Sequence, residues 1–119
     1  MKKTIKIGEK EVKLESNART FRTYKRMTGR DPLIEFFALA DGTVDSPGES
    51  INQEFVYDMM YCLAKKGDPN IPDDIDDWLD EFDEFPLADL LFDVVVPMIE
   101  KNVSSSQESK KKPGRPKKQ

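Results

Sequence analysis

The carboxylates between residues 68 and 100 are the side chains of this sequence with the most obvious chemistry. This segment contains twelve Asp and Glu residues and no Lys or Arg. An EF-hand beginning at Asp68 is excluded, because Pro72 and Asp73 occupy the positions that require a metal ligand and a glycine. Paired carboxylates for glycoside hydrolysis are disfavoured by the small size of the chain and the lack of an evident cleft. Two interpretations stay open, a solvated helix surface or a docking face for a basic partner segment.

The usual nucleophiles and their bases are missing. The chain has no histidine and one cysteine, Cys62, which excludes Ser-His and Cys-His catalysis and the common zinc sites. Cys62 lies among apolar residues at helical spacing, so we interpret it as a core residue. A single cysteine allows no intramolecular disulfide and is typical of a reducing compartment. No glycine-rich phosphate loop is present. We therefore expect a protein that is not an enzyme and needs no cofactor.

Two basic segments point to nucleic acid as an alternative partner. In the tail, Pro113-Gly114-Arg115-Pro116 is similar to an AT-hook core, with Lys112, Arg115 and Lys117 as candidate contacts. The other segment is a predicted helix that carries the basic residues Arg19, Arg22, Lys25 and Arg26 and is followed by Arg30. Its Phe21 and Tyr24 share an apolar stripe with Met27, which favours a core role over base stacking.

The elements that would position these groups begin with a hairpin. Residues 4–7 and 12–14 alternate apolar and polar side chains and predict two strands with one buried face, formed by Ile5, Ile7, Val12 and Leu14. A lone hairpin is marginal in water, so it must pack on the helices that follow.

Five helices are predicted after the hairpin, at about 17–29, 32–40, 51–66, 75–82 and 86–101. Asn17, Asp31 and Asp74 are expected to be N-caps. Gly29 is expected to end the first helix in a left-handed conformation, with Pro32 opening the second. Pro97 should kink or end the last helix. Residues 41–50 read as a loop.

The remaining segments bound the domain. No apolar residue follows Val103, so we expect residues 1–102 to form one domain and residues 103–119 a disordered basic tail. Residues 1–20 contain no apolar stretch of the signal-peptide kind, and residues 87–99 are too short to span a bilayer. The predicted fold class is α+β and mostly helical, with the hairpin packed on about five helices.

The order of these features resembles a known family. A short hairpin, the segment Ala18-Arg19-Thr20-Phe21-Arg22-Thr23-Tyr24-Lys25, the break Gly29-Arg30-Asp31-Pro32 and an apolar helix are similar to the tail assembly chaperones of long-tailed phages and prophages of Gram-positive bacteria. The similarity extends through residues 57–65 and the acidic segment around Trp78, and covers about residues 1–102.

This resemblance implies a small, non-catalytic protein of the host bacterial cytoplasm. Such chaperones keep the long tape measure protein soluble and help tail tube subunits assemble around it. Many are also made in a longer, frameshifted form, and the run Lys110-Lys111-Lys112 is compatible with an A-rich slippery site.

A tape measure protein is a long amphipathic helix, which a groove with an apolar floor could cover. Candidate floor residues are Phe36, Phe37, Met59, Met60 and Trp78, and the alternative for each is an ordinary core role. The leading prediction is therefore a tail assembly chaperone with tape measure and tail tube proteins as partners and no membrane partner. The alternative is a small nucleic-acid-binding accessory protein that uses the basic first helix or the tail.

Overall fold

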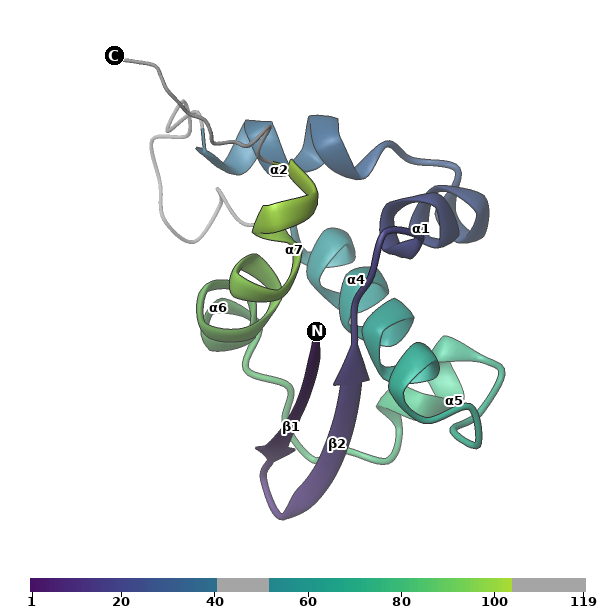
Figure 1. Ribbon diagram of the computed structural model, residues 1–119. Coiled ribbons are helices and arrows are strands. Elements are labelled where there is room, and N and C mark those ends of the chain that lie inside the picture. Colours follow the sequence, from purple (N-terminus) through teal and green to yellow (C-terminus); the bar gives the residue numbers. More distant parts are fainter. Residues whose placement is uncertain (41–51, 104–119) are drawn as a thin grey trace.

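A computed structural model describes residues 1–40 and 52–103 and confirms the predicted fold class, an N-terminal hairpin packed on helices (Figure 1). The elements in chain order are β1 Lys2–Ile7, β2 Lys10–Glu15, α1 Thr20–Thr28, α2 Pro32–Ala40, α4 Gln53–Gly67, α5 Ile75–Leu79, α6 Leu87–Leu90, the π-turn η1 Leu91–Val95 and α7 Val96–Val103. The predicted loop at 41–50, the first predicted residue of the third helix and the tail at 104–119 lie outside the described residues.

The two strands pair antiparallel, with Ile5 opposite Val12. Gly8 in the connecting turn has φ 64°, a conformation that glycine adopts without steric cost. The predicted buried face is confirmed, because Ile7, Val12 and Leu14 belong to the core and Ile5 packs against it. The pairing runs further than predicted, since the Met1 ammonium also donates to the Ser16 carbonyl at 2.7 Å.

Helix α4 is the centre of the fold. Its fully buried side chains are those of Phe55, Val56, Met59, Met60 and Leu63. In Figure 1, α4 runs through the middle of the molecule with α1, α5, α6 and the hairpin around it. Asn52 caps its start by accepting a hydrogen bond from the Phe55 N–H at 3.2 Å. A helix covered on so many sides must be apolar around most of its circumference.

The break between α1 and α2 is formed by the residues predicted for it, whereas the predicted N-cap of α1 is not. Gly29 ends α1 with φ 77°, and Asp31 Oδ1 accepts the Leu33 N–H at 2.9 Å ahead of Pro32. The prediction that Asn17 is the N-cap of α1 is wrong, because the helix begins at Thr20 and Arg19 is the flanking residue. Asn17 forms a turn instead, with its Oδ1 accepting the Arg19 N–H at 2.9 Å.

Helix α5 is shorter than the predicted helix at 75–82. Asp74 caps it as expected, accepting from the Asp76 and Asp77 N–H groups. Two single turns follow, in which the Glu81 and Phe82 N–H groups each donate to a carbonyl three residues back. Trp78 is buried against the rings of Tyr61, Phe82 and Phe85. This aromatic cluster fixes the acidic segment to α4.

Pro97 does not end the last helix, which continues from Leu87 to Val103. The helix widens into the π-turn Leu91–Val95 directly before the proline, with the Val96 N–H donating to the Leu91 carbonyl. Pro97 has no N–H to donate to the Asp93 carbonyl, and Lys3 Nζ lies 3.5 Å from that oxygen instead. A local change of helix type therefore accommodates the proline. None of the described helices combines the length and the hydropathy needed to cross a bilayer.

Gly67 tests the contact between α4 and the hairpin. A Cβ at this position would lie 2.6 Å from the Lys13 carbonyl carbon and 2.8 Å from the Leu14 nitrogen. We expect Gly67→Ala to lower the free energy of unfolding by about 1–3 kcal/mol, because the strand must shift to admit the methyl group. Urea denaturation measures this, with the exposed neighbour substitution Lys66→Ala as control. Equal stability of the two variants would contradict the close approach.

Candidate functional site

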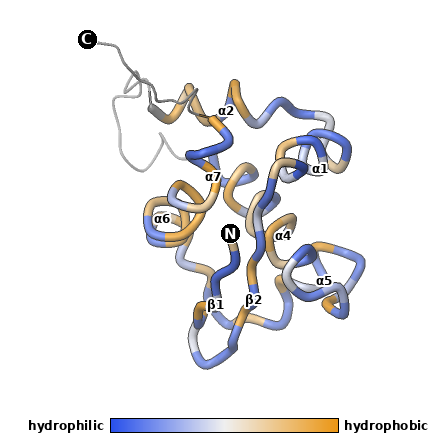
Figure 2. Tube along the Cα trace, viewed as in Figure 1, coloured by the Kyte–Doolittle hydropathy of each residue, from blue (hydrophilic) through white to orange (hydrophobic). Residues whose placement is uncertain are grey.

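The outer face of α2 carries three of the six large hydrophobic side chains that are exposed among the described residues. Leu33, Ile34 and Phe37 are exposed, with Ile34 at 68% and Phe37 at 55%. Phe37 lies three positions after Ile34 and four after Leu33, so the three side chains share one side of the helix. Figure 2 shows hydrophobic colouring along α2, which lies at the upper edge of the molecule. Apolar side chains grouped in this way are typical of a protein-binding surface.

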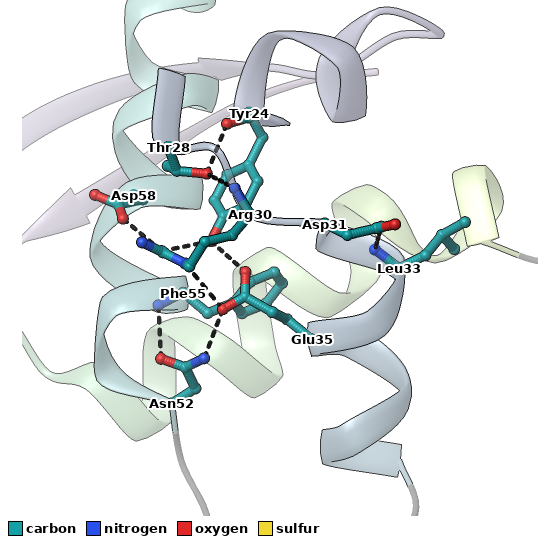
Figure 3. A network of polar contacts seen from close by, with 9 residues as sticks. All are labelled: Tyr24, Thr28, Arg30, Asp31, Leu33, Glu35, Asn52, Phe55 and Asp58. Atoms are coloured by element: carbon teal, nitrogen blue, oxygen red, sulfur yellow. Dashed lines mark hydrogen bonds and ion pairs between the residues drawn. The ribbon is translucent and has the colours of Figure 1, made fainter. Parts of the chain in front are cut away.

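Glu35 is the only polar residue of α2, and it holds the helix to its neighbours (Figure 3). Its Oε1 accepts the Tyr24 hydroxyl of α1 at 2.6 Å, and its Oε2 pairs with Arg30 Nε at 3.1 Å. Arg30 Nη2 in turn contacts Asp58 Oδ2 of α4 at 2.6 Å and the Tyr24 hydroxyl at 2.8 Å. We call these four residues, together with Asn52, the Glu35 network.

Asn52 connects this network to the start of α4. Its Nδ2 donates to Glu35 Oε2 at 2.6 Å while its Oδ1 caps α4. Thr28 completes the turn from α1, because its hydroxyl donates to the Tyr24 carbonyl at 2.9 Å and accepts the Arg30 N–H at 3.0 Å. The Glu35 network therefore joins three helices through hydrogen bonds whose donors and acceptors are matched.

Partial burial strengthens the ion pairs of the Glu35 network. The Glu35 and Asp58 side chains are only 11% and 14% exposed, so water screens the ion pairs less than at an open surface. Burial, followed by the hydrogen bond to Glu35, raises the pKa of Tyr24 far above its ordinary value. The bond to Asp58 raises the pKa of Arg30. Tyr24 is thus a protonated donor, and the arrangement suits structural support rather than proton transfer.

The structure does not bring the five predicted groove residues to one surface. Met59, Met60 and Trp78 are fully buried in the core, Phe36 packs partly against it, and Phe37 is exposed. The alternative interpretation, an ordinary core role, therefore describes the two methionines and the tryptophan. Sequence reasoning missed Leu33 and Ile34, although a helix with one polar residue among nine is a signal for a face that needs a second partner.

The other predicted groups divide in the same way. Tyr24 is buried as expected, whereas Met27 of the predicted apolar stripe is exposed.

Within residues 1–40 and 52–103, no three carboxylate or cysteine side chains are grouped so that they could hold a metal ion. Of the acidic residues, Asp73 pairs with Lys65 and Glu81 pairs with Lys10. The candidate nucleic-acid contacts Lys112, Arg115 and Lys117 lie outside the described residues.

Comparison of this chain with protein-family models, with curated proteins and with solved structures gives no match. The site is therefore argued from its geometry and from the chemistry of its residues.

Arg30→Lys tests whether the Glu35 network holds α2 in place. Lysine keeps the charge but cannot reach Glu35, Asp58 and Tyr24 together, since it has no planar fork of donors. We expect faster amide hydrogen exchange throughout α2 and a loss of about 1 kcal/mol in the free energy of unfolding. Arg26→Lys, on the exposed side of α1, is the matched control. Unchanged exchange in α2 would show that other contacts hold the helix.

Cys62 gives a pH test of the buried core. Burial raises the pKa of its thiol to about 12, so above the ordinary thiol pKa of about 8.5 the unfolded chain binds fewer protons than the folded one. This contribution to stability is complete below that value and is lost as the pH rises towards 12. We expect the wild type to lose stability about 1.4 kcal/mol per pH unit more steeply than Cys62→Ala over this range. Parallel curves in urea denaturation would contradict a buried thiol.

Proposed function

We propose that this protein is a non-enzymatic tail assembly chaperone, which binds the tape measure protein, keeps it soluble and helps to recruit tail tube subunits in the host bacterial cytoplasm. The observation that carries this proposal is the exposed face of α2, formed by Leu33, Ile34 and Phe37. The resemblance of residues 1–102 to such chaperones supplies the identity of the partners.

The chemistry of α2 suits an amphipathic helix as the bound segment. Leu33, Ile34 and Phe37 offer an aliphatic and aromatic surface without charge, which would pack against the apolar stripe of a partner helix. The Glu35 network keeps the opposite side of α2 attached to α1 and α4. Rigid presentation favours binding, because less conformational freedom is lost when the complex forms.

The same face explains why a partner helix would gain solubility. Apolar side chains that alternate with polar ones on a long unpartnered helix promote aggregation. Covering each stretch with a highly charged chaperone removes the apolar stripe from water and adds a charged outer surface, since 35% of the residues of this chain are charged. Neither step requires bond making or breaking.

A second candidate function, binding to a nucleic acid backbone, is favoured by one specific observation. Arg19, Arg22 and Arg26 line a shallow hollow on α1, and within the described part of the chain none of them forms an ion pair. Phosphate contacts made by such residues weaken steeply with added salt, whereas apolar helix capture does not.

The deciding experiment is co-expression with the tape measure protein that the proposal names as partner, followed by recovery of the soluble partner at high salt. We expect the wild type to hold the partner in solution. Ile34→Asp and Phe37→Asp should each reduce recovery at least about tenfold, because a buried Ile or Phe side chain contributes about 1.5–3 kcal/mol.

Phe92→Asp is the matched control, since Phe92 is 60% exposed but lies in η1 rather than α2. Its recovery should equal that of the wild type. A wild type that fails to hold the partner in solution, or binding that needs low salt and the residues after 103, would overturn the chaperone proposal and favour the nucleic acid alternative. Recovery that survives both α2 substitutions would contradict α2 as the binding face.

A further inference from the structure

A second concave surface lies between α1 and the C-terminal half of α4, and α2 contributes nothing to it. It encloses about 370 Å³, which is within the range of cavities that bind small ligands or single large side chains, about 300–1,000 Å³. Met27, Tyr61 and Cys62 are among its lining residues, together with the exposed Thr23. We call this surface the α1–α4 cleft.

The floor of the α1–α4 cleft is apolar and adaptable. Met27 is a flexible thioether on the exposed side of α1, with its sulfur 3.9 Å from Cys62 Sγ. The Tyr61 hydroxyl donates its hydrogen to the Pro72 carbonyl at 2.6 Å, so it has no donor left for a ligand in the cleft. A floor of this kind accepts a large apolar side chain and offers few polar groups to a hydrophilic one.

The rim of the cleft is basic, and its cations are not equivalent. Arg19, Lys65 and Lys66 all line it. Lys65 Nζ has its three donors engaged, by the Pro69 carbonyl at 3.0 Å, the Ile71 carbonyl at 2.8 Å and Asp73 at 2.6 Å. Arg19 and Lys66 make no ion pair with any described residue. Arg19 and Lys66 are therefore two cations beside an apolar floor that can each pair with a carboxylate of a ligand.

We propose that the α1–α4 cleft binds an acidic peptide segment of a partner protein, with one large apolar side chain on the floor and flanking carboxylates paired with Arg19 and Lys66. Charge complementarity carries the choice of occupant. A nucleic acid strand that continued past the cleft along Lys65 would bring its phosphates towards the carboxylate of Asp73, which pairs with Lys65 at 2.6 Å. A peptide needs only the few carboxylates that the two cations accept.

This site goes beyond the proposed function and is independent of it. The α2 face has no charged residue among its exposed apolar side chains and suits a neutral apolar stripe, whereas the α1–α4 cleft selects for carboxylates. One partner, or two different ones, would therefore contact the protein at two chemically distinct places. Loss of either site leaves the other intact, so the two proposals fail separately.

The test is a nitrogen-15 NMR titration of the full chain with two synthetic peptides. The first is Glu-Asp-Leu-Phe-Glu-Asp with blocked ends, and the second replaces each acid by its amide. We expect the acidic peptide to shift the amides of Thr23, Met27 and Cys62, and the amide analogue to bind about tenfold more weakly, since two exposed ion pairs are lost.

Three variants sharpen the result. Thr23→Trp fills the cleft and should abolish the shifts with both peptides. Arg19→Glu combined with Lys66→Glu should reduce the affinity for the acidic peptide to that for the amide analogue or below it. Lys2→Glu combined with Lys6→Glu makes the same charge change on the exposed side of the hairpin and should leave cleft binding within about twofold.

Several outcomes would overturn the proposal. They are equal affinity for the two peptides, shifts confined to α2, no shift at millimolar peptide, or stronger shifts in the cleft with single-stranded DNA than with the acidic peptide. Because the readout is local to each amide, failure here leaves the co-expression result of the α2 variants untouched, and the reverse also holds.

Discussion

The polar anchor of α2 through the Glu35 carboxylate, beside the packing of Phe36 and Leu39 against the core, is the interaction on which the candidate site depends. Glu35 bonds to Tyr24, Arg30 and Asn52, and Arg30 carries the connection to Asp58 on α4. Eight of the nine residues of α2 are apolar, so without this network the helix would gain most by turning its aliphatic face inward. A directional polar anchor fixes which side faces the protein and leaves Leu33, Ile34 and Phe37 exposed.

This anchor rests on α4, whose core side chains are fully buried. Its burial by the hairpin, α1 and the last helix gives Asp58 and Asn52 fixed positions at one end, and the close approach of Gly67 to Lys13 and Leu14 fixes the other. One well-packed helix therefore supports two surfaces of different chemistry, the neutral α2 face and the basic-rimmed α1–α4 cleft.

Local sequence rules predicted most of the fold. Alternation found the hairpin, helical spacing found the helices, and Gly29, Asp31, Pro32 and Asp74 marked their ends, because each acts through bonds within a few residues. The errors about the candidate site came from longer-range contacts, whereas the wrong N-cap at Asn17 came from a local turn. Met59, Met60 and Trp78 were predicted as candidate surface residues, but all three are buried in the core. The Glu35 network joins residues up to 28 positions apart and has no sequence signature.

The most direct measurement of the central claim is methyl cross-saturation NMR on the complex of this chain with a partner tape measure segment. Irradiating the partner should attenuate the methyl signals of Leu33 and Ile34, while those of the buried Val56 and Leu63 keep their intensity. That result would place the exposed face of α2 in the interface. Attenuation confined to Met27 and Thr23, or none in α2, would contradict the account and move the interface elsewhere.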